Sequence, residues 1–297
     1  MSTKPSKRLP FARTCDALGV TFNFEKADRG VIEIMNKESR LAALEKLADE
    51  WEGGRPCTHA EAMPIRGLVN FAEGQIYSRA ASLLLPLLLE RARNECASSA
   101  SSPRMAVELR SFVQFLKMAV PRRVTAKDTR APLCILTDAE LNPARRTAGV
   151  GAVMLGGNAV PTKFFGEKVP GSTIDHICSM ADSDHIISAL ELLAVGLALK
   201  LWGPECMHRR IFIAVDNEAA RAAMLNAGSA APAMRHIIKT IVMNDAKVPM
   251  FRWVIRVPSA SNWADGPSRL DFASLSKVKA ERVRLGEKSF EDFAVGD

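Results

Sequence analysis

The sequence predicts an α/β protein with a mixed sheet flanked by helices in its carboxyl-terminal half and a mainly helical domain before it. Apolar residues recur mostly at helical spacing before residue 121, whereas continuous apolar runs typical of buried strands follow residue 132. Between them, PRRVTAKDTRAP is basic and rich in residues that interrupt helices, which favours a linker. We therefore expect a disordered basic N-terminus (1–12), a mainly helical domain (13–121), a linker (122–131), a mixed α/β domain (132–271) and a charged, solvated C-terminal tail (272–297).

The mainly helical domain is expected to begin with a short hairpin. Residues 17–24 and 30–35 have the composition of two strands. The following segment, 38–51, carries an apolar stripe that includes Leu44 and Trp51 and is typical of an amphipathic helix. Thr58 and Glu61 have the spacing of a capping box, so a second helix is expected to begin near residue 59. Further helices are expected over 83–93 and 105–120.

The mixed α/β domain is expected to contain five strands. Apolar runs at 133–140, 148–155, 162–169, 209–216 and 250–257 have the length and content of strands. A long apolar helix is expected over 182–202, capped by Asp182 or Ser183, and a further helix over 232–247. Three strands in succession, followed by alternating helices and strands, predict a mixed five-stranded sheet with helices packed on it.

Composition narrows the functional classes. The chain has 297 residues, of which 47% are hydrophobic and 25% charged, as in ordinary globular proteins. Its net charge of +7 weakly favours polyanionic partners. The six cysteines are scattered without a C-x-x-C pair, which favours reduced thiols over a disulfide framework or a zinc site. No secretory signal is visible and no uncharged apolar run reaches about 18 residues, so we expect an intracellular protein, cytoplasmic or nuclear, without a membrane partner.

Two aspartates stand at the ends of predicted core strands. Asp138 closes the strand LCILTDAE, and Asp216 closes RRIFIAVD. In open α/β sheets, ligands bind beyond the ends of the strands, so polar residues at these positions can converge on one site. Either aspartate taken alone is equally well explained as an ordinary turn residue.

Glu191 lies on the long apolar helix and is surrounded there by apolar residues. A carboxylate that is desolvated against a core costs several kcal/mol unless a partner compensates it. One explanation is an arginine or lysine partner, or an edge position that reaches water. The other is a metal ion that Glu191 holds together with further carboxylates.

A fourth carboxylate, Asp265, lies in the short stretch SNWADGPSRL after the last strand. Asp, Gly, Pro and Ser are common turn residues, so this aspartate by itself indicates only a turn. Together with Asp138, Glu191 and Asp216, it completes the order strand–Asp, helix–Glu, strand–Asp, final helix start–Asp, which suits a shared carboxylate site.

These motifs resemble the ribonuclease H family, in the form carried by retroelement reverse transcriptases. The resemblance covers about residues 131–271 and lies in TDAELNPARRTAGVGAVM, ISALELLAVGLAL, IAVDNEAA and VPSASNWADGPSR. The last motif, N-x-A-D-x-P-S-R, is most similar to the group with tyrosine recombinases. Upstream, CDALGVTFNF, MPIRGLVNFAEGQIYSRA and ELRSFVQFLKMAVPRR more weakly resemble the thumb and connection of such enzymes. The aromatic-x-Asp-Asp polymerase signature is absent, so we expect the carboxyl-terminal portion of a reverse transcriptase, with the missing polymerase domain as a candidate partner.

The resemblance implies a ribonuclease H-like fold and an endonuclease that cleaves the RNA strand of RNA–DNA hybrids with two Mg²⁺ or Mn²⁺ ions. It implies that Asp138 bridges both ions, that Glu191 and Asp216 complete one metal site, and that Asp265 helps to hold the other. Trp263 is expected either to stack on a sugar or base or to pack against the core, and Asn262 also to brace the turn around Asp265. The candidate contacts to nucleic acid are Arg145, Arg146, Asn217, Asn262 and Arg269.

The sequence also departs from the family pattern. Many cellular members carry a histidine shortly before the last aspartate, but VPSASNW has none, and residues 216–265 lack a clear basic insertion. Both departures favour weak or partner-dependent activity. The alternatives are a catalytically weak or inactive nucleic-acid-binding remnant of the same fold, and a nuclease of the same superfamily that acts on DNA. The sequence leaves the oligomeric state open.

Overall fold

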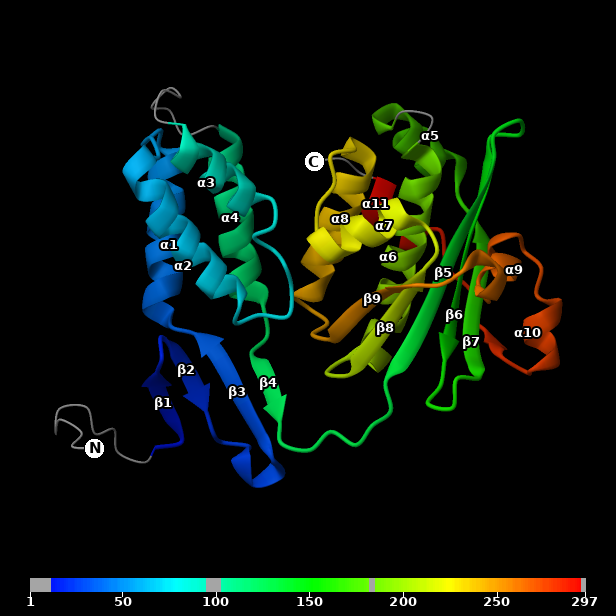
Figure 1. The fold of residues 1–297 in the computed structure, drawn as a ribbon, viewed down its shortest axis with the longest axis horizontal. Coiled ribbons are helices and arrows are strands. Elements are labelled where there is room, and N and C mark those ends of the chain that lie inside the picture. The colour runs from blue at the N-terminus through cyan, green and yellow to red at the C-terminus, as the bar shows by residue number, and fades with distance from the viewer. Residues whose placement is uncertain (1–11, 95–102, 182–184, 295–297) are drawn as a thin grey trace. The chain divides into compact units, whose positions relative to one another are not determined.

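The computed structural model describes residues 12–94, 103–181 and 185–294 (Figure 1). The expected disordered N-terminus, apart from residue 12, and the expected helix caps Asp182 and Ser183 lie outside the described residues. The chain divides into two compact units, residues 1–129 and 130–297.

The N-terminal unit combines a four-stranded antiparallel sheet with four described helices. Its strands, in the spatial order β1-β2-β3-β4, are β1 (Thr14–Ala17), β2 (Val20–Asn23), β3 (Val31–Asn36) and β4 (Arg122–Thr125). Its helices are α1 (Glu38–Glu52), α2 (His59–Glu73), α3 (Leu84–Arg93) and α4 (Pro103–Met118). The capping box of Thr58 and Glu61 forms as expected at the start of α2.

The expectation of a mainly helical N-terminal domain was wrong, because this unit is only partly helical. The difference comes largely from residues 122–125, which belong to the stretch expected as a linker but form β4. β4 pairs with β3, for example Arg122 with Ile34, although the two strands are separated by most of the unit's sequence. β4 is stabilised by backbone hydrogen bonds to a strand that is distant in the sequence. Its own basic, polar composition does not indicate a strand, so it could not be recognised from the sequence.

The C-terminal unit contains a six-stranded mixed sheet in the order β10-β7-β6-β5-β8-β9. Neighbours from β7 to β5 pair antiparallel, whereas β5, β8 and β9 run parallel. The strands are β5 (Leu133–Asn142), β6 (Thr147–Leu155), β7 (Pro161–Lys168), β8 (Arg210–Val215), β9 (Phe251–Arg256) and β10 (Glu281–Arg282). The mixed sheet was expected, but the number of strands was not: β10 pairs parallel with β7 over only two charged residues, too few to show a strand pattern.

Helices cover both faces of this sheet. One face packs in the main core against α5 (Gly171–Met180), α6 (Ile186–Cys206), α7 (Glu218–Asn226), α8 (Pro232–Asp245) and α11 (Lys288–Ala294). On the other face, α9 (Asp265–Ser268) and α10 (Ala273–Lys277) lie close to the strands, and Leu136, Val153 and Leu275 pack together in a second, smaller core.

Helix α6 is apolar on all sides because it is enclosed on all sides. It is the one described helix that is long and apolar enough to cross a membrane, yet most of its apolar window is buried inside this unit. Its residues pack between the sheet and α8 in the main core. An all-apolar helix in the centre of a folded unit is the ordinary result of such burial.

The segment after residue 272 is part of the C-terminal unit, although a solvated tail was expected. Phe290 and Phe293 of α11 are buried in the main core. The Phe293 ring lies against Gly196 of α6, where an added Cβ would come within 2.7 Å of it. The sequence did not predict this helix, because its apolar face consists of only two phenylalanines among charged residues. A helix this short shows too little periodicity to be recognised.

Candidate metal centre

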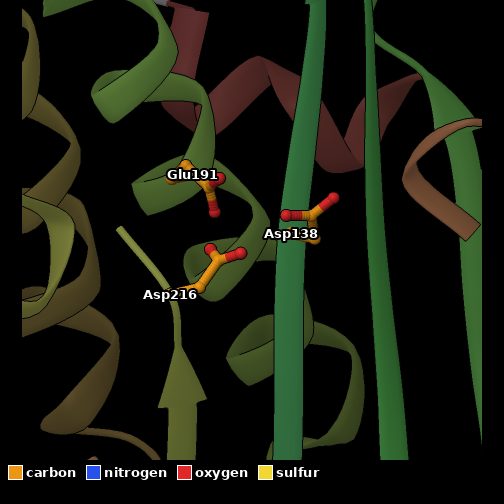
Figure 2. A group of neighbouring side chains, drawn as sticks. All are labelled: Asp138, Glu191 and Asp216. Carbon is orange, nitrogen blue, oxygen red and sulfur yellow. The ribbon is translucent and has the colours of Figure 1, made fainter. Parts of the chain in front are cut away.

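The candidate site lies where strands β5 and β8 separate. Their parallel pairing ends at Leu136 and Ala214. β8 stops at Val215, so Asp216 follows it directly, while β5 continues and presents Asp138 two residues beyond the last pair. Glu191 reaches the same gap from the neighbouring helix α6, and Figure 2 shows the three carboxylates grouped there.

The three carboxylates are close and poorly solvated. One oxygen atom from each lies within 4.8 Å of the others. Glu191 and Asp138 are only 5% and 6% exposed, whereas Asp216 is partly exposed. The Oε2 atom of Glu191 is buried and has no hydrogen-bond partner. The structure therefore brings together three of the four predicted carboxylates and leaves a buried acceptor atom unsatisfied.

The electrostatics of the cluster favour protonation. Burial, followed by the charges of Asp138 and Asp216, raises the pKa of Glu191 to about 9, although the backbone of Ala139 partly opposes this shift. Burial also raises the pKa of Asp138 to about 6, against the lowering effect of its hydrogen bond with Ser268. No arginine or lysine in the described part of the chain forms an ion pair with Glu191. The structural explanation for a buried Glu191, a cationic side-chain partner, is therefore not supported.

The residues present fit a hard divalent cation. Carboxylate oxygens are the preferred ligands of Mg²⁺ and Mn²⁺. Ligand oxygens lie about 2.1 Å from Mg²⁺ and hence about 3–4 Å from one another, so the three oxygens need only a small inward movement to share an ion. The cluster can therefore bind metal, and a bound cation would satisfy the unpaired oxygen of Glu191.

Asp265, the fourth predicted carboxylate, does not join the cluster of three. Its Oδ1 atom accepts a hydrogen bond from Nε of Arg269 at 3.0 Å and lies 2.9 Å from Nη2 of the same side chain. The Asp265 side chain is 48% exposed. Its charge nevertheless contributes to the raised pKa of Asp138, which places it in the electrostatic neighbourhood of the cluster.

The turn that carries Asp265 lies directly on the sheet because three glycines make room for it. An added Cβ at Gly149, Gly151 or Gly166 would overlap backbone atoms of Pro267 or Ser268. In this position the hydroxyl of Ser268, which is buried, donates a hydrogen bond to Oδ2 of Asp138. Sequence reasoning missed Ser268; the signal that points to it is the pair of alternating glycines in β6, Gly149 and Gly151, which leave part of one face of the strand without side chains.

Asn262 braces the turn inside the protein, as was expected, and its burial does not favour the predicted contact with nucleic acid. The side chain is 5% exposed. Its Nδ2 donates to the carbonyl of Thr137 at 2.9 Å, and its Oδ1 accepts from the backbone N–H of Ala264 at 3.2 Å. Asn262 therefore anchors the loop after β9 to the strand residue next to Asp138.

Asn217 also has a structural role beside the cluster. Its Oδ1 caps α7 by accepting from the backbone N–H of Ala220, and its Nδ2 donates to the hydroxyl of Ser188 at 3.3 Å. These bonds fix the turn at Asp216. They also occupy the amide that was expected to contact nucleic acid.

The predicted arginine contacts are on the surface. Arg145 lines a polar hollow together with Lys168, Ser268 and Arg269. Arg146 is exposed and forms an ion pair with Asp175 at 3.3 Å. These positions are compatible with contacts to a charged ligand.

Trp263 is 40% exposed, so part of its side chain is accessible for the stacking contact that was one of its two expected roles.

No family model and no curated protein matches the sequence. Among solved structures, RNase H1 of the halophilic archaeon Halobacterium salinarum NRC-1 aligns at 16% identity over 48% of this chain and 99% of that chain, with a TM-score of 0.37. LC11-RNase H1 in complex with an RNA/DNA hybrid aligns at 14% identity, again over 48% and 99%, with a TM-score of 0.38.

A longer alignment involves the foamy viral protease-reverse transcriptase in complex with dsDNA. It covers 84% of this chain and 45% of that chain at 13% identity, with a TM-score of 0.31. At these identities and TM-scores, neither activity nor substrate follows for this chain. The observed mixed sheet with helices on both faces confirms the predicted α/β fold class, with six strands in place of five.

Proposed function

We propose that this chain is a metal-dependent endonuclease that hydrolyses the RNA strand of RNA–DNA hybrids. The observation that carries the proposal is Glu191, a buried carboxylate that meets two other carboxylates without any cationic side chain. A buried carboxylate without a counter-charge destabilises the folded state by several kcal/mol. A purely structural role for Glu191 would not explain why the protein keeps such a group. A bound divalent cation removes this cost, and Mg²⁺ or Mn²⁺ suits the all-oxygen ligand set.

The proposed centre holds two ions. Two ions about 4 Å apart would activate the attacking water and stabilise the leaving oxygen. Asp138 is suited to bridge them, because Ser268 holds its Oδ2 and fixes the orientation of the carboxylate. Glu191 and Asp216 would complete one site. Asp265 would serve the other after Arg269 releases it, and a substrate phosphate is the natural competitor for that guanidinium.

The choice of an RNA–DNA hybrid is the finer part of the proposal. It is supported by the resemblance of the four sequence motifs. The polar hollow that contains Arg145, Lys168 and Arg269 adjoins Ser268 and offers cations for a phosphate backbone. Distinguishing RNA from DNA requires contacts with the 2′-hydroxyl group.

We further propose that the chain derives from the carboxyl-terminal part of a retroelement reverse transcriptase of the tyrosine-recombinase group. The motif N-x-A-D-x-P-S-R supports this origin. The polymerase domain would be its partner, in the cytoplasm or nucleus.

The second candidate function is a nucleic-acid-binding remnant without catalysis. The pairing of Asp265 with Arg269 favours it, because this pairing leaves the cluster with three of its four expected carboxylates. The remnant would bind hybrids as well as the nuclease does but would not cleave them.

The test is cleavage of an end-labelled RNA–DNA hybrid with Mg²⁺ or Mn²⁺. The wild type should shorten the RNA strand, and Asp138→Asn should not. Asp49→Asn is the matched control, because this exposed carboxylate belongs to the N-terminal unit and pairs there with Arg110. Equal product from wild type and Asp138→Asn, or no product from either, would overturn the nuclease proposal. Binding without cleavage would establish the remnant, and preferential cleavage of double-stranded DNA would establish the third hypothesis, a DNA nuclease.

A further inference from the structure

One face of strands β8 and β9 is left uncovered and carries aromatic side chains. The parallel register pairs Phe212 with Trp253 and Ala214 with Ile255, so these residues share one face of the sheet. The small core under α9 and α10 reaches Ala214 but does not include Trp253 or Ile255. Trp253 is 50% exposed and Ile255 is 40% exposed. β9 is also the last strand of the sheet, at the edge opposite β10 (Figure 1).

Trp253 is exposed because its face of the sheet is uncovered, although the strand β9 itself is firmly packed on the opposite face. The neighbours that point to the other face are held: Val254 packs against the main core, and Arg252 pairs with the buried Asp245 at 2.6 Å. On the exposed face, the rings of Trp253 and Phe212 lie next to each other, with centroids 6.0 Å apart and planes inclined by 38°. The strand thus presents the Trp253 ring to solvent beside the partly exposed ring of Phe212.

The charges beside this aromatic pair are positive. Arg210 precedes Phe212 by two residues on the same face of β8. Its Nη2 donates to the carbonyl of Arg130 at 2.7 Å, and Nη2 of the adjacent Arg209 donates to the carbonyl of Ala131 at 2.8 Å. A carbonyl oxygen accepts the hydrogen bond but does not neutralise the charge. The described residues of β8 and β9 on this face are Arg210, Phe212, Ala214, Phe251, Trp253 and Ile255, which include no carboxylate.

We infer that this face binds single-stranded nucleic acid, with bases stacked on Trp253 and Phe212 and phosphates near Arg209 and Arg210. An aromatic surface beside uncompensated cations is complementary to exposed bases on a phosphate backbone. A duplex does not fit this description, because the faces of its paired bases are covered by their own neighbours. The surface is separate from the metal centre: Cys134, opposite Phe212 on β5, precedes Asp138 by four residues, or about 13 Å of strand.

Tryptophan fluorescence provides the test, since Trp51 and Trp202 are buried while Trp253 and Trp263 are exposed. The full chain is titrated in EDTA with oligothymidylate and, separately, oligouridylate of about 12 nucleotides, within the range of known single-strand sites. We expect saturable quenching that is lost in Trp253→Ala and retained in Trp263→Ala. Comparison of the two oligonucleotides shows whether DNA or RNA is preferred.

Anisotropy of the labelled oligonucleotide measures affinity without relying on the protein's fluorescence. Trp253→Ala should weaken binding at least about fivefold, whereas Trp253→Phe should largely restore it, because a phenyl ring also stacks. Arg209→Gln with Arg210→Gln should make the salt dependence shallower. Circular dichroism confirms that each variant is folded. Asp138→Asn should bind the single strand like the wild type, so this result stands whether or not the protein is a nuclease.

Three results would overturn the inference. The first is unchanged affinity in Trp253→Ala. The second is the absence of binding to either oligonucleotide, and a concentration-dependent self-association that Trp253→Ala abolishes would then assign the face to a second copy of the chain. The third is loss of single-strand binding in Asp138→Asn, which would place the strand at the metal centre.

Discussion

Two buried carboxylates of the C-terminal unit have the same exposure and opposite surroundings. Asp245 and Glu191 are each 5% exposed. Asp245 pairs with Arg252, whose side chain is itself largely buried, at 2.6 Å. Glu191 has two carboxylates beside it and an oxygen without a partner. Burial alone therefore does not distinguish the two acids. The difference is that Asp245 has a counter-charge, whereas Glu191 has none among the described residues.

Neutralising Glu191 should have the largest effect on activity. Glu191→Gln removes a proposed metal ligand and should lower hybrid cleavage about a thousandfold or more, as expected when several kcal/mol of charge stabilisation is lost. The same change should raise the melting temperature of the metal-free protein near neutral pH, because folding no longer requires a proton to be taken up at Glu191. Cleavage assays and thermal melts in EDTA measure the two effects. A variant that melts lower and cleaves normally would show that Glu191 is a structural residue.

Neutralising Asp245 should lower the stability of the protein and leave its cleavage activity nearly unchanged. Asp245→Asn leaves the charge of Arg252 in a buried position, and removal of one partner from a buried pair costs about 3–5 kcal/mol. Denaturant unfolding should report this loss, while cleavage per folded molecule stays near that of the wild type. A stability equal to that of the wild type would contradict the contrast between the two acids.

The stability of the metal-free protein should decrease as the pH rises. The folded-state pKa values of Glu191 and Asp138, about 9 and about 6, lie above their ordinary values of 4.5 and 3.8. The folded state therefore holds protons that the unfolded state releases, so unfolding becomes easier as pH increases through this window. Melts in EDTA should fall by several degrees between about pH 5 and about pH 9.

Two controls connect this pH dependence to the cluster. Glu191→Gln should remove most of the slope, and Mg²⁺ should restore stability to the wild type at the high-pH end. A slope that is unchanged by both would assign the effect to other groups.

The smallest expected effect concerns Ser268. Ser268→Ala removes the hydrogen bond to Asp138 without removing a ligand, and residues that orient metal ligands commonly change metal affinity about tenfold or more. Calorimetric titration with Mn²⁺ measures the change. Ser289→Ala, which replaces a serine of α11 away from the cluster, is the matched control. Equal affinity in both variants would show that the hydrogen bond does not orient Asp138.

Much of the candidate site was visible in the sequence because each acid breaks a local rule. Glu191 interrupts an apolar helix, and Asp216 follows directly after an apolar strand. Asp138 was expected to end its strand but lies inside β5, which continues to Asn142. Partners that lie far apart in the chain were not visible. The bond from Ser268 to Asp138 and the fit of Pro267 over the glycines depend on the folded sheet. The pairing of Asp265 with Arg269, however, has i,i+4 spacing and could have been predicted from the sequence.

The fold was predicted where periodicity was long and missed where elements were short. The five longer strands of the C-terminal unit were found, whereas the two residues of β10 and the four of β4 were not. Short strands are specified by the strand they pair with and carry little pattern of their own. The same reason hid α11, whose apolar face consists of Phe290 and Phe293.

The contact between Phe293 and Gly196 sets an order of events during protein synthesis. Gly196 lies on the same helix as Glu191, and the ring that packs against it comes from almost a hundred residues later in the chain. While the chain is still on the ribosome, α6 lacks this packing partner until residue 293 has emerged. The core behind the carboxylate cluster is therefore completed only after Phe293 has emerged, when Asp138, Glu191 and Asp216 have long been synthesised.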